Sequence, residues 1–122
     1  MSREGRQRAE RHGRIAEIYA ALIYCLCGFR ILARRYRTKF GEADLILRRG
    51  NLIVVVEVKY AGAGQVIDAV LPSRRQLERI ERAALIYQSR HPECAGAMLR
   101  LDIIVVRPWG RFRRIRNAGS SN

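Results

Sequence analysis

The stretch "GEADLILRRGNLIVVVEVKY" (residues 41–60) contains two apolar segments joined at Gly50-Asn51. This dipeptide is one of those favoured as the two-residue loop of a β-hairpin. The segments on either side, residues 42–49 and 52–59, are rich in Ile, Leu and Val, which is typical of strands. We therefore predict an antiparallel strand pair in which the numbers of directly paired residues add up to 101.

This register brings charged residues of the two strands together. Asp44 lies opposite Glu57, and Glu42 lies opposite Lys59. Directly opposed side chains lie within about 5 Å on one face of the pair. Glu42 and Lys59 can form an ordinary ion pair, whereas two opposed carboxylates destabilise the pair unless something neutralises them. A raised pKa, a nearby arginine or a divalent cation would do so.

Two interpretations of the acidic pair are open. In the first, the hairpin is half exposed and its carboxylates pair with Arg34, Arg35 or Arg48. In the second, they bind Mg²⁺ or Mn²⁺, which prefer oxygen ligands and also bridge to phosphate oxygens. Glu57 interrupts the apolar run "LIVVVEV", and buried acids are rare unless they are paired or bound to metal. This position favours the metal site.

Lys59 supports the same site. Of the 24 basic residues, 22 are arginines and only two, Lys39 and Lys59, are lysines. A compact ammonium group can orient or help to deprotonate a water molecule, and its pKa can shift on burial, whereas a guanidinium does neither well. In a chain that so strongly prefers arginine, a lysine beside paired acids indicates a chemical role.

The charge of the chain indicates its kind of partner. The 122 residues include 24 basic and 11 acidic side chains, a net charge of +13, and 48% of them are apolar, as in globular proteins. Such a surface suits polyanions, most commonly nucleic acid. No apolar run reaches the about 18 residues of a membrane span, and no signal peptide is recognisable. The three cysteines match no usual zinc spacing and predict reduced thiols in a cytoplasmic protein.

The chain is predicted to form one α/β domain over residues 1–122, with a central mixed five-stranded sheet flanked by helices. Residues 1–12 are expected to be a basic, partly frayed N-terminus, and residues 117–122 a flexible tail. Ser73 is the expected N-cap of the second helix. The expected elements are helices at 15–26 and 74–90, and strands at 29–37, 42–49, 52–59, 98–107 and 111–116.

The first of these helices has an amphipathic pattern. Its apolar residues recur at three- and four-residue spacing. Glu17 shares a helix face with Ala20, Ala21 and Tyr24, small or amphipathic residues that would allow the helix to approach the sheet closely. From its residue type alone, Glu17 is expected to face solvent. The apolar residues of the pattern are Ile15, Ile18, Tyr19, Leu22, Ile23 and Leu26.

An acid, a strand turn and then Glu-Val-Lys is the pattern of the PD-(D/E)XK nuclease superfamily. The segments "GEADLI" and "VVVEVK", after "GFRILARRYR" and before "AVLPSRR", resemble more closely the YraN-like family of predicted bacterial endonucleases. That family is related in fold to archaeal Holliday-junction resolvases and restriction enzymes. The resemblance covers residues 16–106 and implies a restriction-endonuclease-like fold.

The resemblance also implies roles for individual residues. Asp44 and Glu57 match the two metal-binding acids, and Lys59 matches the catalytic lysine. Glu17, in "RIAEIYAAL", looks like a helical acid that completes the metal site, and Glu42 matches a supporting residue. Asp102 matches a family aspartate that either acts at the site or holds a nearby arginine.

The chain departs from the family pattern at two places. Arg74 stands where the family has lysine. Tyr60 and Ala61 stand where the family usually has a basic residue.

These observations together predict a Mg²⁺- or Mn²⁺-dependent endonuclease that hydrolyses DNA, or possibly RNA, at branches, nicks or breaks. Arginine contacts to phosphate distinguish little between base sequences, so binding that selects the structure of the nucleic acid is expected. The alternative is a non-catalytic nucleic-acid-binding module that retains the nuclease fold. A homodimer is a hypothesis by analogy with related nucleases. The residues expected to contact nucleic acid are Arg34, Arg35, Arg37, Lys39, Arg74 and Arg75.

Overall fold

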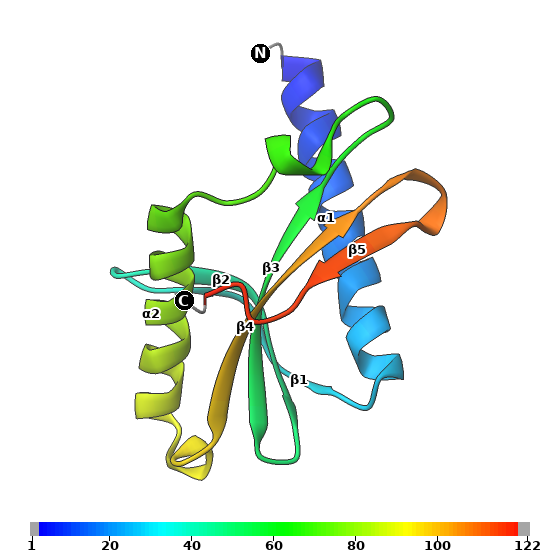
Figure 1. The fold of residues 1–122 in the computed structure, drawn as a ribbon. Helices are drawn as coiled ribbons and strands as arrows, with labels where there is room; N and C mark the ends of the chain where they lie inside the picture. Colours follow the sequence, from blue (N-terminus) through cyan, green and yellow to red (C-terminus); the bar gives the residue numbers. More distant parts are fainter. Residues whose placement is uncertain (1–2, 120–122) are drawn as a thin grey trace.

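The computed structural model describes the backbone of residues 3–119 and the side chains of residues 13–119 (Figure 1). Within residues 3–119 the chain forms two α-helices, five strands and three short 3₁₀ helices. All the predicted helices and strands are confirmed, and the first helix begins at Arg3, within the basic N-terminal segment. The elements are α1 (Arg3–Leu26), β1 (Arg30–Arg37), β2 (Glu42–Arg49), β3 (Leu52–Tyr60), α2 (Arg74–Arg90), β4 (Met98–Val106) and β5 (Phe112–Ile115).

The hairpin between β2 and β3 has the predicted register. Pairs run from Arg49–Leu52 to Leu45–Val56, and the numbers of each pair add up to 101. Gly50 has a φ of 59°, a conformation that costs glycine little because it has no Cβ. This loop therefore fixes which side chains of the two strands face each other.

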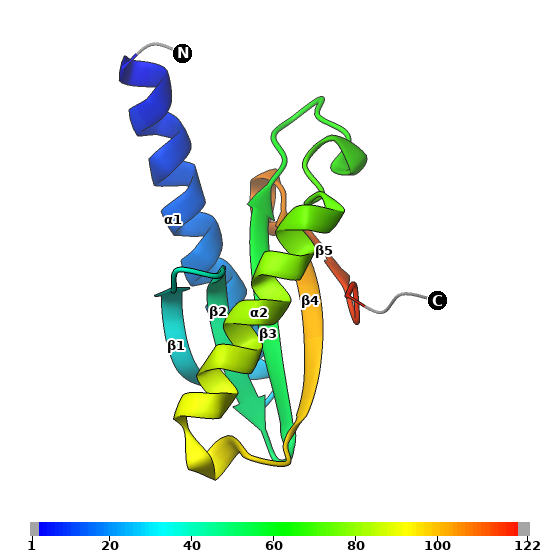
Figure 2. The ribbon, with the colours of Figure 1, turned by 90° about the vertical axis from the view of Figure 1, so that its left-hand side faces the viewer.

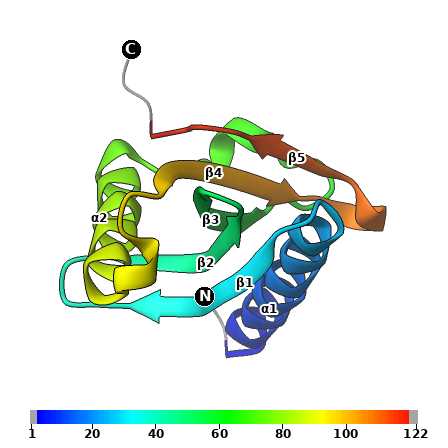
Figure 3. The ribbon, with the colours of Figure 1, turned by 90° about the horizontal axis from the view of Figure 1, so that it is seen from below.

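The sheet is mixed, as predicted. Its strands are arranged in the order β1-β2-β3-β4-β5. β3 and β4 are parallel, and the other neighbours are antiparallel. The crossover between the parallel strands contains α2, which covers one face, while α1 covers the other (Figures 2 and 3). This α/β domain is consistent with a restriction-endonuclease-like fold.

Each face of the sheet has its own apolar core. Beneath α2, the buried residues include Ile46, Val55, Ile80 and Val105. Beneath α1, they include Leu45, Val54, Val56 and Ile104. Adjacent residues of β3 and β4 thus belong to opposite cores, as expected of strands that alternate between two buried faces.

The orientation of α1 differs from that expected of an amphipathic helix. Its buried residues are Ala16, Ala20, Ala21 and Tyr24, which include the small face that Glu17 was predicted to share. Small side chains let the helix lie close to a sheet whose own side chains already fill the space. Four of the six residues of the apolar pattern are consequently exposed: Ile15, Ile18, Leu22 and Leu26.

The beginning of α2 is set by local hydrogen bonds. The hydroxyl of Ser73 accepts a hydrogen bond from Gln76 N–H at 3.2 Å, and Gln76 Oε1 accepts one from Ser73 N–H at 2.9 Å. This reciprocal capping box confirms Ser73 as the N-cap. Ile80, Ala84 and Tyr87 are buried on one face of the helix. The cap therefore fixes the positions of Arg74 and Arg75, the first two residues of α2, whose side chains are exposed.

Part of the predicted C-terminal tail is attached to the sheet. Asn117 N–H donates a hydrogen bond to Asp102 Oδ1 at 3.1 Å, and Ala118 N–H donates one to Leu101 O at 2.7 Å. Residues 120–122 lie outside the described residues, as do the side chains of residues 1–12. Among the described helices, none has the length and apolar character needed to cross a membrane.

Candidate active site

The two strands of the hairpin separate at Asp44. Pairing between β2 and β3 ends at Leu45–Val56, one residue before the predicted Asp44–Glu57 pair. The carboxylate replaces a backbone group there, because Asp44 Oδ2 accepts a hydrogen bond from Val58 N–H at 2.7 Å. The strands thus open a gap in the ladder that the Asp44 side chain fills.

The direction of β2 also changes at Asp44. Ala43 packs in the core beneath α2 and Leu45 in the core beneath α1, whereas residues two apart in a regular strand share a face. The pairs Arg34–Leu45 and Tyr36–Ala43 place Arg35 across from Asp44, and Arg35 has a φ of 49°. Non-glycine residues in this region cost free energy and cluster at functional sites.

Asp44 and Glu57 form a carboxyl pair. The Glu57 side chain is only 17% exposed. Its burial, followed by a hydrogen bond to Asp44 and repulsion from the Asp44 carboxylate, raises the pKa of Glu57 to about 8. A proton held between the two acids therefore neutralises the like-charge pair in the metal-free protein. This is the first of the three neutralising factors anticipated from the sequence.

Lys59 lies beside this pair. Its Nζ is 3.9 Å from Glu57 Oε1, at the long end of the ion-pair range. The Lys59 charge opposes the rise in the pKa of Glu57 but does not cancel it. The ammonium group is thus near the acids without being held tightly by either of them.

The predicted cross-strand pair of Glu42 with Lys59 is wrong. Glu42 is instead bound by Arg79 of α2 through two hydrogen bonds, Nη2 to Oε2 at 2.8 Å and Nε to Oε1 at 3.3 Å. These bonds lower the pKa of Glu42 and raise that of Arg79. The strands have already separated at this point, so α2 rather than β3 supplies the partner.

Glu17 faces the site from α1. Its Oε1 accepts a hydrogen bond from Arg35 Nε at 2.9 Å, and this contact raises the pKa of Arg35. Arg35 is also close enough to Asp44 to be affected by its charge. Arg35, one of the arginines anticipated beside the hairpin acids, therefore also links Asp44 to Glu17, a contact that the sequence did not predict. Glu17 and Arg35 line a groove together with Gly13, Arg14 and Arg37.

The turn between β1 and β2 is locked onto α2. A Cβ on Gly41 would lie 1.9 Å from the Arg79 carbonyl oxygen, so the backbones are in direct contact. Arg82 Nε donates a hydrogen bond to Phe40 O at 3.0 Å, and Thr38 Oγ1 accepts one from Gly41 N–H at 3.0 Å. This attachment holds the start of β2 and, three residues later, Asp44.

Gly41→Ala is expected to lower the free energy of unfolding by about 2 to 4 kcal/mol, the range of severe overpacking. The effect is steric, because the φ of Gly41 is not in the left-handed region. Chemical denaturation measures it. Gly62→Ala is the matched control, since its Cβ would meet only the Tyr60 ring at 3.7 Å. An equal effect of the two substitutions would show that the contact with Arg79 is not what matters.

Asp102 has a structural place in the fold. It is fully buried, and its two carboxylate oxygens accept hydrogen bonds from Arg100 Nε and Nη2 at 2.9 and 3.0 Å. Tyr24 O–H donates a third bond at 2.7 Å, and Asn117 N–H a fourth. Of the two roles anticipated, holding a nearby arginine is confirmed. The same acid ties α1 and the C-terminal segment to β4.

The acidic pair has the chemistry that magnesium requires. Mg²⁺ is usually bound by one or two carboxylates together with waters and substrate phosphates, and Asp44 and Glu57 provide two carboxyl groups in contact. Within the described part of the chain, no group of three or more His, Cys, Asp or Glu side chains is arranged to hold a metal ion. Glu17 is thus not assembled with the pair into a three-acid site, nor do the cysteines form one.

The raised pKa of Glu57 predicts how stability depends on pH. Between about pH 4.5 and pH 8, the folded protein keeps a proton that the unfolded chain has released, so increasing pH favours unfolding. In EDTA, stability should fall by about 2 to 4 kcal/mol between pH 5 and pH 9. Glu57→Gln, which cannot ionise, should remove most of this fall when both proteins are unfolded in denaturant at each pH. A parallel loss in both proteins would contradict the assignment.

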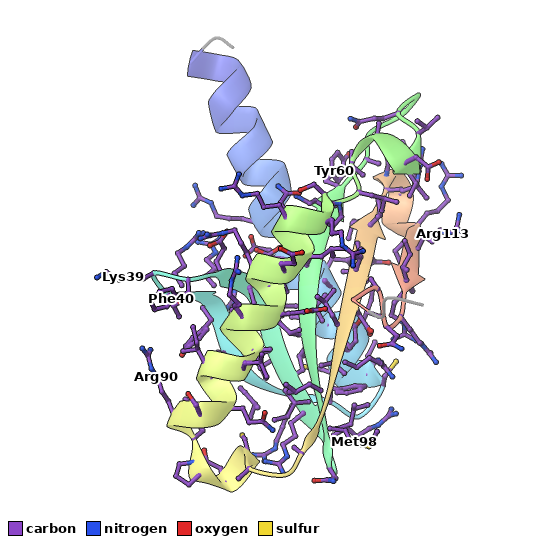
Figure 4. All side chains as sticks on the ribbon, turned by 60° about the vertical axis from the view of Figure 1, so that its left-hand side comes forward. Lys39, Phe40, Tyr60, Arg90, Met98 and Arg113 are labelled. Carbon is purple, nitrogen blue, oxygen red and sulfur yellow. The ribbon has the colours of Figure 1, made fainter. Side chains whose placement is uncertain are left out.

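The predicted nucleic-acid contacts are all exposed. Arg34, Arg35 and Arg37 project from β1, and Lys39 lies in the turn that follows it. Figure 4 shows Lys39 and Phe40 extending from this turn, away from the sheet. Arg74 and Arg75 extend from the first turn of α2. Basic side chains thus come from β1, from its turn and from α2.

The model of the uncharacterised protein family UPF0102 matches residues 16–106, which include every element from the second half of α1 to the end of β4. The chain belongs to the UPF0102 family. This is the YraN-like family that the sequence motifs resemble, so the predicted family membership is confirmed.

Curated UPF0102 proteins are similar over most of their length. One from Agrobacterium fabrum is 46% identical, with 84% of each chain covered. One from Mesorhizobium japonicum is 44% identical over 93% of this chain and 90% of its own. One from Paramagnetospirillum magneticum is 43% identical over 92% and 89%. These names state a family and no activity, so the function has to be argued from the site.

Proposed function

We propose that this UPF0102 protein is a metal-dependent nuclease that hydrolyses phosphodiester bonds in DNA. The observation that carries the proposal is the contact of the Asp44 and Glu57 carboxyl groups where β2 and β3 separate. A fold gains nothing in stability from such a pair, and perturbed carboxyls of this kind are typical of functional sites. The net charge of +13 supports a polyanionic substrate.

In this proposal, Asp44 and Glu57 would hold Mg²⁺ or Mn²⁺, and Glu17 would join them as a ligand once Arg35 releases it. The ion, when bound, would supply positive charge that stabilises the negative charge developing on the phosphodiester oxygens. Lys59 orients the attacking water beside Glu57. Arg79 fixes Glu42, and with it the start of β2. Arg35 and Arg37 then face the phosphate backbone from the groove edge.

The proposed substrate is DNA recognised by its structure, such as a branch, a nick or a broken end. Arginine side chains that contact phosphates position a protein on nucleic acid but do not read its sequence. The exposed basic residues near the site come from β1, its turn and the start of α2. This distribution supports recognition of the shape and charge of the backbone. RNA with similar geometry is a second substrate to include in the test.

Lys59→Ala is expected to retain DNA binding and to lower cleavage by about a hundredfold or more, as for loss of a residue that assists proton transfer. Lys39→Ala is the matched control, because it removes the other lysine of the chain without touching the acidic pair. The control should weaken binding slightly and leave the cleavage rate of bound DNA unchanged. Single-turnover cleavage of branched, nicked and single-stranded substrates with Mn²⁺ measures both quantities.

A binding module that does not cut is the second candidate. Glu17 is paired with Arg35, and within the described residues the site is not arranged as a group of three metal ligands. Both features favour a protein that only holds nucleic acid. Wild-type protein that binds DNA with a steep salt dependence but cleaves none of these substrates would establish this alternative.

A further inference from the structure

The outer side of α1 has an exposed apolar surface. Ile15, Ile18, Leu22 and Leu26 follow one another at spacings of three and four residues and are 50–89% exposed. We call these four residues the α1 apolar face. The helix packs on the sheet through its alanines instead, so the stronger apolar pattern of the helix stays exposed among the side chains of residues 13–119. Apolar patches of this kind mark interaction sites.

The α1 apolar face continues onto the turn between β4 and β5. Tyr19 of α1 donates a hydrogen bond to the Gly110 carbonyl oxygen, and its ring meets that of Phe112 edge to face at 6.3 Å. Trp109, in the same turn, is 95% exposed. A pocket between the helix and this turn is lined by residues that include Ile15, Tyr19 and Trp109. A projecting ring and a hollow thus lie next to each other.

Charge is scarce on this part of the chain. From Ile15 to Phe29 the sequence contains one charged residue, Glu17, which points towards Arg35. The remainder of the chain is strongly basic. Along this stretch of α1 nucleic acid would find no cation for its phosphates, and Arg107 of the adjoining pocket lies at the edge of the surface. A membrane-surface helix normally has Lys or Arg flanking its apolar side along its whole length, and from Ile15 to Leu26 there is none.

We infer that a second copy of this chain covers the α1 apolar face, through a two-fold interface between the two α1 helices. Such an interface uses the same patch on both partners, which requires an uncharged, self-complementary surface in a chain of charge +13. The α1 apolar face, Trp109 and Phe112 together expose on the order of 700 Å², against about 800 Å² that each partner of a standard interface buries. The Trp109 ring of each copy can enter the pocket between α1 and the β4–β5 turn of the other copy.

The dimer leaves the candidate active site open. On a helix with 3.6 residues per turn, Glu17 lies on the other side of α1 from Leu22. Glu17 is directed towards Arg35 and the groove on β1. The two active sites of the dimer would therefore lie outside the interface. The inference needs only the apolar surface and does not rest on the proposed nuclease activity.

The test is the molar mass in solution, measured by sedimentation equilibrium with a reductant that keeps the exposed Cys25 and Cys27 from cross-linking. At about 50 µM protein and about 0.5 M salt, where repulsion between basic chains is screened, we expect about 28 kDa, twice the 14.0 kDa of one chain. Leu22→Glu should raise the dissociation constant at least about a hundredfold. Trp109→Ala should raise it about tenfold or more.

Leu85→Glu is the matched control, because Leu85 is also a helical leucine and is also 56% exposed, but lies on α2. It should leave the dissociation constant unchanged. A wild-type protein that stays monomeric under these conditions would overturn the inference, as would equal effects of Leu22→Glu and Leu85→Glu. Anionic phosphatidylglycerol vesicles provide the other arm. If Leu22→Glu abolishes vesicle binding by a monomeric wild-type protein, the surface serves a membrane and the dimer is refuted.

Discussion

Asp44→Asn is expected to abolish metal-dependent cleavage, by about ten thousandfold, and at the same time to make the protein more stable. Metal ligands at phosphoryl-transfer sites provide charge stabilisation that an amide cannot replace. In the metal-free protein, however, Asp44 repels Glu57, and this repulsion adds to the rise in the Glu57 pKa that burial causes in the first place. The asparagine can still accept the hydrogen bond from Val58 N–H. At pH 9, above the Glu57 pKa of about 8, the gain should be about 1 to 2 kcal/mol.

Calorimetric titration with Mg²⁺ or Mn²⁺, cleavage of branched DNA and denaturant unfolding in EDTA measure the three parts of this prediction. Asp68→Asn is the matched control, since it removes the same charge from an exposed position in the loop before α2. It should change none of the three. If Asp44→Asn bound metal as the wild type does, the metal site would be assigned wrongly. If it lost cleavage and also lost stability, the like-charge pair would not be a source of instability.

Asp102→Ala is expected to lower the free energy of unfolding by about 3 to 5 kcal/mol, the cost of breaking a buried ion pair by removing one partner. The substitution leaves Arg100 without its bidentate partner and the buried Tyr24 hydroxyl without an acceptor. Burial and the hydrogen bond to Asp102 raise the pKa of Tyr24, so the Tyr24 hydroxyl keeps its proton. Without Asp102, this buried donor lacks a hydrogen-bond acceptor, which costs free energy. The N–H of Asn117 loses its acceptor as well.

Urea unfolding of Asp102→Ala, with Asp68→Ala as the exposed control, measures this effect. Asp102→Asn should have a smaller effect, because one carbonyl oxygen remains to accept a hydrogen bond. Cleavage by any folded fraction of Asp102→Ala should be nearly unchanged per molecule. A stable Asp102→Ala protein that had lost cleavage would instead show that this acid acts at the site.

The two acids therefore have opposite relations to stability, and the structure explains why. Asp102 is surrounded by donors, which satisfy both of its oxygens. Asp44 faces one backbone donor and one other acid. A partly buried carboxyl that costs free energy needs a reason other than folding to be there, and in our proposal metal binding at a phosphodiester is that reason.

Much of this arrangement could be predicted because it depends on local chain chemistry. Gly50-Asn51 permits one tight loop, and a two-residue loop determines the register of the strands beside it. Ser73 and Gln76 mark the start of α2 in the same local way. Alternating apolar residues then determine which positions are buried. The proximity of Asp44, Glu57 and Lys59 follows from these local features.

Contacts between distant segments could not be predicted in this way. Gly41 and Glu42 meet Arg79, which lies 37 residues beyond Glu42, and that contact replaces the ion pair expected with Lys59. Glu17 and Arg35 are joined only when α1 lies across the sheet. In both cases the partner is chosen by the position of a helix, because a long arginine binds whichever carboxylate lies within reach.

The sequence by itself determined the strand order along the chain, the register of the central hairpin and the acids and lysine that lie together. Only the tertiary structure decided where the strands separate, which arginines hold Glu17 and Glu42, and which side of α1 is buried. The spacing of apolar residues shows that the helix has an apolar side, but not which side packs on the sheet. The narrow space above the sheet admits only small side chains, so the alanines of α1 pack there and the apolar residues Ile18 and Leu22 face solvent.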